Sequence, residues 1–185
     1  MLLNKRNPFT LNGFPRRRWQ NFPVMTFERP NIEKMQGYTP GEQPDDGDSI
    51  KLNTNENPYP PSPLIKTALK NFDTDVLQRY PDPSASNLRK LVASRFDVSA
   101  ENVVVTNGGD EGLRLAVTTF VKPNGVLGMA DPSYSLYPVL ANIQDCRIES
   151  LRLETDWTLP NRFSERINMS DAQLTCLVNP HAPSG

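Results

Sequence analysis

The sequence has few of the residues that would indicate a metal centre or a disulfide scaffold. Its 185 residues include one histidine, His181, and two cysteines, Cys146 and Cys176. A lone histidine without clustered cysteines gives no basis for a metal site. Both cysteines stand in apolar stretches, so we expect buried thiols in a reducing compartment, the cytoplasm. A disulfide between them is the alternative.

Strong charge and long apolar runs are also missing. The formal net charge is −1, so the composition gives no reason to expect nucleic acid or a membrane surface as a partner. No apolar run approaches the roughly 18 residues that a membrane-spanning helix needs. The length nevertheless suffices for one domain with a real hydrophobic core.

Residues 1–34 differ from the rest of the chain. Basic residues precede the first acid, Glu28, prolines recur, and no helical or strand period persists. We interpret this stretch as a basic, proline-rich disordered extension, upstream of a true start at Met25 or Met35. The alternative is a transit peptide, but the prolines argue against the amphipathic helix that such peptides form.

Residues 35–63 are expected to form an N-terminal arm and a substrate-side loop. The arm contains one aromatic, Tyr38, and arms of this kind usually pack on another subunit or rim a site. Residues 50–52 are predicted to be a short strand, followed by a loop rich in asparagine and proline. Ser62 then caps a helix that has Pro63 at its first position.

The stretch around which the chain is organised runs from residue 101 to 115. Three consecutive valines, residues 103–105, predict a short strand buried on both faces. Residues 106–109 form a turn with two glycines, and Asp110 and Glu111 open an amphipathic helix. A strand, a glycine turn and a helix start present free backbone N–H groups to an anion. An ordinary strand–helix turn with capping acids is the alternative.

Residues 64–185 are expected to form an α/β domain. Apolar periodicity predicts helices over 64–72 and 88–96, each with a buried stripe. Further predicted elements are strands over 126–130, 147–153 and 173–178, a helix over 134–143 and a short helix within 157–169. Their alternation predicts a mainly parallel sheet with flanking helices. Loops 107–110, 131–134 and 179–185 should converge at the carboxyl edge of its strands, where ligands bind.

The last predicted strand has no element after it to cover it. A parallel strand buried on both faces needs such cover. We therefore expect the α/β domain to be incomplete and the chain to be the front half of a longer protein.

Five short motifs occur in the order and spacing of a known family. The chain resembles the class I/II pyridoxal-phosphate aminotransferases, and within them the histidinol-phosphate aminotransferases, over about residues 35–185. The motifs are Leu-Asn-Thr-Asn-Glu-Asn-Pro at 52–58, Arg-Tyr-Pro at 79–81, Thr-Asn-Gly-Gly-Asp-Glu-Gly at 106–112, Pro-Ser-Tyr at 132–134 and Asn-Pro-His-Ala-Pro-Ser-Gly at 179–185.

The resemblance implies a fold-type-I large domain that binds pyridoxal 5'-phosphate. It assigns the cofactor phosphate to the amides of Gly109 and Asp110, and stacking on the cofactor ring to Tyr134. It assigns Tyr80 to the phosphate of a neighbouring subunit's cofactor, which implies a homodimer. Positions near the substrate, an amino donor or a 2-oxo acid, match Tyr38, Asn55 and Glu56, for which loop capping is the alternative.

Two departures from the family pattern bear on activity. Ala182 stands where the family has an asparagine that donates to the ring hydroxyl, and the preceding residue, His181, could compensate. The Schiff-base lysine of the family follows the Asn-Pro motif, whereas the last lysine here is Lys122. No catalytic residue is therefore assigned, and we expect the chain alone to be inactive.

The resemblance implies transamination between an imidazole-bearing amino-alcohol phosphate and 2-oxoglutarate, a step of histidine biosynthesis. An aromatic or aspartate aminotransferase, or a threonine-phosphate decarboxylase, would share the same phosphate cradle and stacking tyrosine. An inactive fragment or a cofactor-less interaction module is the alternative outside enzymes.

Overall fold

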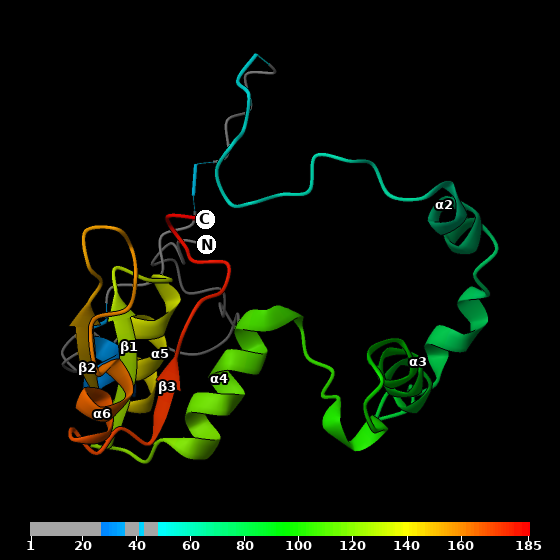
Figure 1. Ribbon diagram of the computed structural model, residues 1–185. Coiled ribbons are helices and arrows are strands. Elements are labelled where there is room, and N and C mark those ends of the chain that lie inside the picture. Colours follow the sequence, from blue (N-terminus) through cyan, green and yellow to red (C-terminus); the bar gives the residue numbers. More distant parts are fainter. Residues whose placement is uncertain (1–26, 36–40, 43–47) are drawn as a thin grey trace, which may run out of the picture.

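The computed structural model describes residues 27–35, 41–42 and 48–185 (Figure 1). Its described elements, in chain order, are α1 (Pro30–Glu33), α2 (Pro63–Lys70), the 3₁₀ helix η1 (Thr74–Gln78), α3 (Ser86–Phe96), the 3₁₀ helix η2 (Ala100–Asn102), α4 (Gly108–Phe120), β1 (Val126–Asp131), α5 (Leu136–Gln144), β2 (Arg147–Arg152), α6 (Phe163–Asn168) and β3 (Leu174–Cys176).

The three described strands form a parallel sheet in the order β2-β1-β3. Val126 of β1 pairs with Arg147 of β2, and Leu127 of β1 pairs with Leu174 of β3. Helices α5 and α6 connect successive strands, as parallel pairing requires. The predicted α/β class with a mainly parallel sheet is confirmed.

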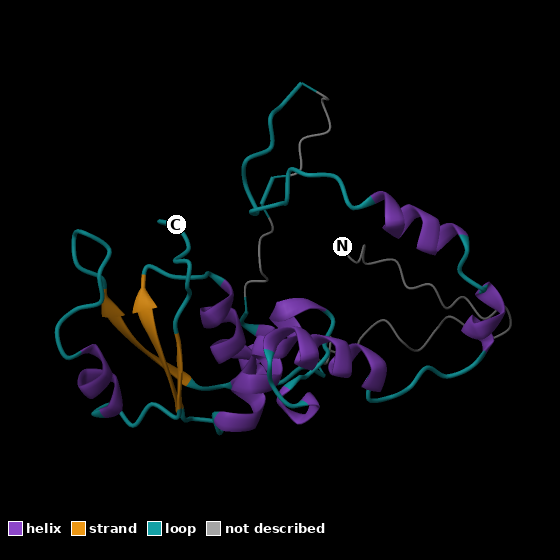
Figure 2. Ribbon diagram, turned by 45° about the vertical axis from the view of Figure 1, so that its right-hand side comes forward, coloured by secondary structure: helices purple, strands orange, loops and turns teal. Residues whose placement is uncertain are grey.

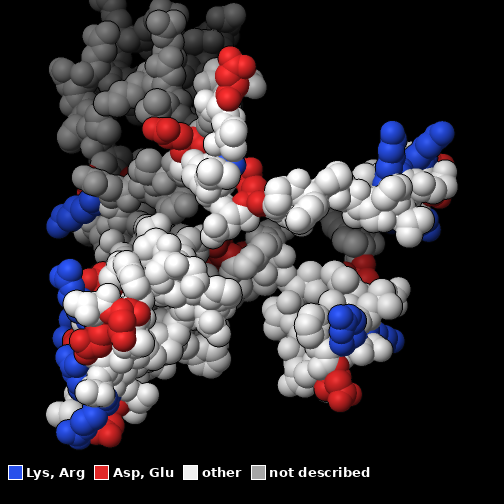
Figure 3. Space-filling view, turned by 45° about the horizontal axis from the view of Figure 1, so that its top comes forward, with Lys and Arg blue, Asp and Glu red and all other residues white. Residues whose placement is uncertain are grey.

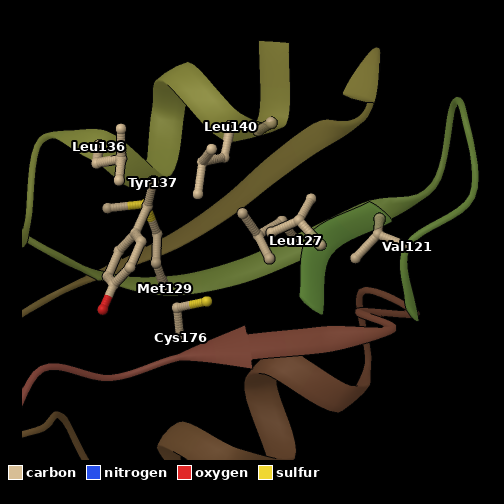
Figure 4. Close-up of a cluster of buried hydrophobic side chains, with 9 residues drawn as sticks. Val121, Leu127, Met129, Leu136, Tyr137, Leu140 and Cys176 are labelled. Carbon is tan, nitrogen blue, oxygen red and sulfur yellow. The ribbon is translucent and has the colours of Figure 1, made fainter. Parts of the chain in front are cut away.

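The central strand of this sheet is β1, which is buried along residues 126–130. Leu127 and Met129 belong to a cluster with side chains of α4 and α5 on one face (Figure 4). Ala130 belongs to a second cluster, with Leu151 of β2 and residues of α6 on the other face. Burial on both faces explains why β1 is a continuous apolar run rather than an alternating one.

The close approach of α6 to β1 depends on Gly128. A Cβ atom added there would lie 2.7 Å from Cγ2 of Ile167, which is too close for any side chain. Ile167 is among the most deeply buried side chains of the molecule. A glycine in the strand therefore lets the helix pack directly on the backbone.

The predicted strand at residues 103–105 is wrong. These residues have no regular structure, and the side chain of Val104 is 78% exposed. Residues 50–52, also predicted as a strand, are irregular as well, and Ile50 and Leu52 are exposed. A strand needs a neighbour for its backbone hydrogen bonds, and neither segment pairs with one among the described residues. The doubly buried central position belongs instead to β1.

Helices α2 and α3 form where the periodicity predicts them, but their predicted buried stripes are wrong. Ser62 caps α2 by accepting a hydrogen bond from the N–H of Leu64, at 3.3 Å. Yet α2 has no buried residue, and α3 buries only Ala93. Figure 1 shows both helices on a stretch that extends away from the sheet, and Figure 2 shows the three strands side by side in a separate part of the molecule.

The sheet is also more open at β3 than the sequence predicts. The strand is three residues long, and of these only Cys176 is buried. It lies at an edge of the described sheet, and Leu177 beyond it is half exposed. Cys176 and the half-buried Cys146 are both free thiols, and burial is the main cause that raises the pKa of each.

The short helix α1 contacts the end of α5. The Arg29 guanidinium donates to the carbonyl of Ile143, and the Asn31 amide donates to that of Asn142, both at 2.7 Å. These carbonyls belong to the last turn of α5, the negative end of the helix dipole, where a positive charge such as that of Arg29 is favourable. Part of the stretch that the sequence assigns to the extension therefore packs on the α/β unit.

Charges of both signs are interspersed on the face shown in Figure 3, around broad areas without charge. In the part of the chain that the structure describes, no helix has the length and apolar character needed to cross a membrane.

Candidate functional site at the carboxyl edge of the sheet

The first turn of α4 begins at a glycine in an unusual conformation. Gly108 has a φ of 78°, a value that strains residues with side chains. Its N–H donates to the carbonyl of Thr106 at 2.9 Å. The N–H of Asn107 donates to the carboxylate of Glu111 at 2.7 Å. The N–H groups of Asn107 and Gly108 are therefore already paired.

The next two amides are free to receive a ligand. No described residue accepts a hydrogen bond from the N–H of Gly109 or Asp110. A Cβ atom added to Gly108 or to Gly109 would meet no atom within 4 Å. Open space thus lies beside unpaired N–H groups at the positive end of a helix of 13 residues. This arrangement suits an anion.

Tyr134 lies against this helix start. Its hydroxyl donates to Oδ1 of Asp110 at 3.1 Å, which joins the loop after β1 to the first turn of α4. Its ring is half-buried and packs edge-on against the buried ring of Tyr137, with centroids 5.8 Å apart. Because both ends of the side chain have partners, an aromatic ring is held close to the two free amides.

A third loop is tied to the same place. Nε2 of His181, in the segment after β3, lies 2.9 Å from the carbonyl oxygen of Pro132, next to Tyr134 in the chain. Nδ1 of the same ring lies 2.7 Å from the hydroxyl of Ser184. Trp157, from the loop after β2, stacks obliquely on the imidazole at 5.8 Å between ring centroids. The loops predicted to converge are therefore joined by hydrogen bonds.

The sequence interpretation missed Trp157 and Ser184. Trp157 could have been found, because it follows a strand of the same parallel sheet and so leaves from the same edge. Ser184 carries no comparable signal. Ser133, also in the loop after β1, has a buried hydroxyl oxygen without a hydrogen-bond partner among the described residues. Such orphaned atoms are rare in proteins and normally have a bound partner.

Two acids at the helix start have partners of their own. The hydrogen bond from the Asn107 N–H is the main cause that lowers the pKa of Glu111, and Arg114 adds an ion pair at 3.4 Å. The carboxylate of Asp110 accepts from Tyr134. Both carboxylates thus have hydrogen-bond donors within the chain. Acids in a first helical turn also stabilise the helix.

The remaining predicted site residues are not brought to this cluster. Tyr80 is fully exposed and lies between η1 and α3, on the stretch that extends away from the sheet (Figure 1). Asn55 and Glu56 are exposed in their loop, where Glu56 pairs with Lys51. That contact is the main cause of the lowered pKa of Glu56. Tyr38 lies outside the described residues.

Lys122 stands at the opposite end of the sheet from Tyr134. It precedes β1, whereas the loop of Tyr134 follows it. A six-residue strand separates these ends by about 20 Å, at about 3.3 Å a residue. Lys122 is therefore not placed to react with a group held beside Tyr134. Ala182, in the turn after β3, offers no side-chain donor.

Curated relatives match most of this chain and less than half of their own length. A histidinol-phosphate aminotransferase of Rhodopirellula baltica is 44% identical over 158 residues, which are 85% of this chain and 43% of the relative. That of Chromohalobacter salexigens is 42% identical, covering 86% and 44%, and that of Clostridium botulinum is 41% identical, covering 84% and 43%. No protein-family model matches the sequence.

Solved structures agree on the fold. The histidinol-phosphate aminotransferase from Sinorhizobium meliloti, in complex with pyridoxal-5'-phosphate, superposes with a TM-score of 0.74 at 20% identity. The match covers 88% of this chain and 45% of that one. The α-aminoadipate aminotransferase from Thermus thermophilus gives a TM-score of 0.55 at 21% identity, covering 65% and 31%. The fold-type-I class predicted from the sequence is confirmed for the part that this chain spans.

Proposed function

We propose that this chain, which is 41–44% identical to histidinol-phosphate aminotransferases over the part that it spans, belongs with them among the class I/II pyridoxal-phosphate aminotransferases and forms the phosphate-binding and ring-stacking side of such an active site. The whole protein would pass an amino group from an imidazole-bearing amino-alcohol phosphate to 2-oxoglutarate, in histidine biosynthesis. It would act in the cytoplasm as a homodimer.

The pair of free amides at Gly109 and Asp110 beside the ring of Tyr134 carries this proposal. The amides and the helix dipole would hold the cofactor phosphate, a contribution of about 0.3–2 kcal/mol from the helix terminus. Tyr134 would stack on the pyridine ring and fix its plane, worth about 0.5–1.5 kcal/mol beyond the area buried. The bound cofactor would supply the electron sink for amino-group transfer.

Both acids at the helix start have hydrogen-bond donors within the chain. A carboxylate 4 Å from a phosphate would oppose its binding by about 1 kcal/mol per unit of phosphate charge in water, so the amides and the helix terminus must outweigh that repulsion. Here Asp110 accepts from Tyr134 and Glu111 from Asn107, so both carboxylates are oriented by N–H or O–H donors. The backbone of Asp110 can then donate to a phosphate while its side chain positions the aromatic.

The other predicted contacts remain proposals. We assign Tyr80 to the cofactor phosphate of a neighbouring subunit, which fits its full exposure away from the cluster. We assign Tyr38, Asn55 and Glu56 to the substrate side. We expect the domain boundaries at residues 34 and 63 to separate the extension, the arm and the α/β part. Lys122, the last lysine of the sequence, precedes β1 and so stands at the other end of the strand from Tyr134, and we expect the chain alone not to turn over.

Binding of pyridoxal 5'-phosphate to the chain tests this proposal. Gly109→Pro removes one N–H donor, and proline is tolerated in the first helical turn. We expect it to weaken binding about tenfold or more, the effect of losing one hydrogen bond to a charged group. Gly112→Ala is the matched control, because it keeps every amide and meets only Thr106 at an ordinary 3.5 Å. Equal affinity of the two variants would contradict the phosphate assignment.

A second candidate is a product that binds no cofactor, and Ala182 favours it. The family motif has an asparagine donor at this position, which alanine cannot replace. The two candidates differ in one measurement, the retention of pyridoxal 5'-phosphate over pyridoxal by the wild-type chain. Preference for the phosphorylated form supports the enzyme-derived site, and no preference supports the second candidate.

A further inference from the structure

His181 contacts three residues at the carboxyl edge of the sheet, and the family motif assigns it no role of its own. Its two ring nitrogens have different partners, the carbonyl oxygen of Pro132 and the hydroxyl of Ser184. A carbonyl oxygen can only accept, so Nε2 must carry the proton in that bond. Nδ1 shares a hydrogen bond with the hydroxyl of Ser184, which can either donate or accept. Both ring nitrogens of the imidazole therefore have hydrogen-bond partners within the chain.

The bond to Pro132 reaches the segment that positions the aromatic. Pro132 lies two residues before Tyr134, between the end of β1 and the start of α5. The hydroxyl of Tyr134 in turn donates to Asp110, at the start of α4. One chain of contacts therefore runs from the turn after β3, through the loop after β1, to the free amides.

Trp157 holds the imidazole from a third direction. Its ring lies 5.8 Å from that of His181 at an angle of 43°. His181 is half-buried, although it lies in a turn within five residues of Gly185. Stacking and two hydrogen bonds leave the ring little rotational freedom.

We propose that His181 is a positioning residue: its imidazole braces the loop of Tyr134 so that the ring stays oriented beside the Gly109 and Asp110 amides. The brace would maintain ring stacking in a chain that has Ala182 in place of the asparagine donor. The proposal rests on the proposed cofactor site for its consequence, but the brace itself can be measured without any ligand.

Three substitutions separate the two ring nitrogens. His181→Gln places an amide nitrogen at about the reach of Nε2, so it can still donate to Pro132. His181→Asn is one bond shorter and reaches only about as far as Nδ1. Ser184→Ala removes the partner of Nδ1 and leaves the Nε2 donor in place. We expect Gln and the Ser184 variant to behave like wild type, and Asn to lose the brace.

Fluorine NMR of the ligand-free chain reads the brace directly. With 3-fluorotyrosine at all five tyrosines, Tyr134→Phe identifies the Tyr134 resonance. We expect that resonance to stand apart from that of the exposed Tyr80 and to move most of the way toward it in His181→Asn, with restoration in His181→Gln. An unchanged resonance in His181→Asn, or the same movement in all three variants, would overturn the proposal.

Two ligands then test the consequence. We expect His181→Asn to weaken binding of pyridoxal 5'-phosphate about fivefold, as for one neutral hydrogen bond, and to leave inorganic phosphate binding unchanged. Equal weakening of both would show a general loss of structure and overturn the positioning role. If the wild-type chain bound neither ligand, the proposed function would fail, and the fluorine resonance would still decide the brace.

Discussion

Helices α5 and α2 have similar local signals and opposite surroundings. Both are short and amphipathic, and α2 has the better start, with a serine cap and a proline in its first turn. Yet α5 buries four side chains against the sheet, whereas α2 buries none. The difference is the partner, because α5 lies between β1 and β2 in sequence and covers both. Local sequence decides where a helix forms, and a facing surface decides whether its apolar side is buried.

The largest expected effect is on the free energy of unfolding, and it should differ between β1, in the packed sheet, and α2, on the extended stretch. Leu127→Ala removes a fully buried side chain from the middle of β1 and should lower the free energy of unfolding by about 2–5 kcal/mol. Leu69→Ala, on α2, removes one that is 73% exposed and should cost less than about 0.5 kcal/mol. Urea denaturation of both variants measures this, and equal losses would show that α2 packs on a surface in solution.

A smaller effect is expected at the aromatic that the packed region presents. Tyr134→Ala should weaken retention of pyridoxal 5'-phosphate by up to about tenfold, because stacking is worth about 0.5–1.5 kcal/mol. Tyr134→Phe keeps the ring and should lose less. Equilibrium dialysis gives both constants, and unchanged retention in the alanine variant would count against stacking.

The serine cap of α2 offers the opposite test, on the helix without burial. Ser62→Ala removes the acceptor for the Leu64 N–H and should cost about 1 kcal/mol of local helix stability. Amide hydrogen exchange in α2 should accelerate about fivefold, while exchange in α5 stays unchanged. Acceleration in both helices would mean that α2 is cooperative with the sheet.

The smallest expected effect is the response of the α4 start to acid. The folded-state pKa of Glu111 is lowered, chiefly by the hydrogen bond from the Asn107 N–H. Its stabilising contribution is therefore present above the unfolded-state pKa and is lost as pH falls through the folded one. The Asn107 amide resonance should follow this titration, and Glu111→Gln should abolish the acid-dependent shift. A shift that persists in the variant would have another origin.

The comparison also shows how far the sequence could predict the molecule. The caps, the periodicity and the apolar runs correctly predicted α2 to α6 and β1 to β3, because those signals are local. The parallel order and the meeting of loops at one edge followed from general rules for α/β sheets. The strand at residues 103–105 and the buried stripes of α2 and α3 were wrong, because pairing and burial depend on neighbours far along the chain.

Some features of the candidate site were likewise predictable from local sequence, and others were not. The free amides at Gly109 and Asp110 were foreseeable from a glycine turn before a helix, and Tyr134 from the end of a strand. The contact between Tyr134 and Asp110, and the use of both His181 nitrogens, depend on how three loops sit against one another. No spacing in the sequence encodes those contacts. Tyr80, Asn55 and Glu56 were assigned through the resemblance alone, and their roles stay predictions.

A titration of the isotopically labelled chain with inorganic phosphate, followed at single amides, tests the anion site directly. We expect the Gly109 and Asp110 N–H resonances to shift most and to saturate together, with the Tyr134 ring responding and α2 remaining unchanged. Saturable shifts elsewhere, with those two amides unmoved, would contradict the anion site at the start of α4.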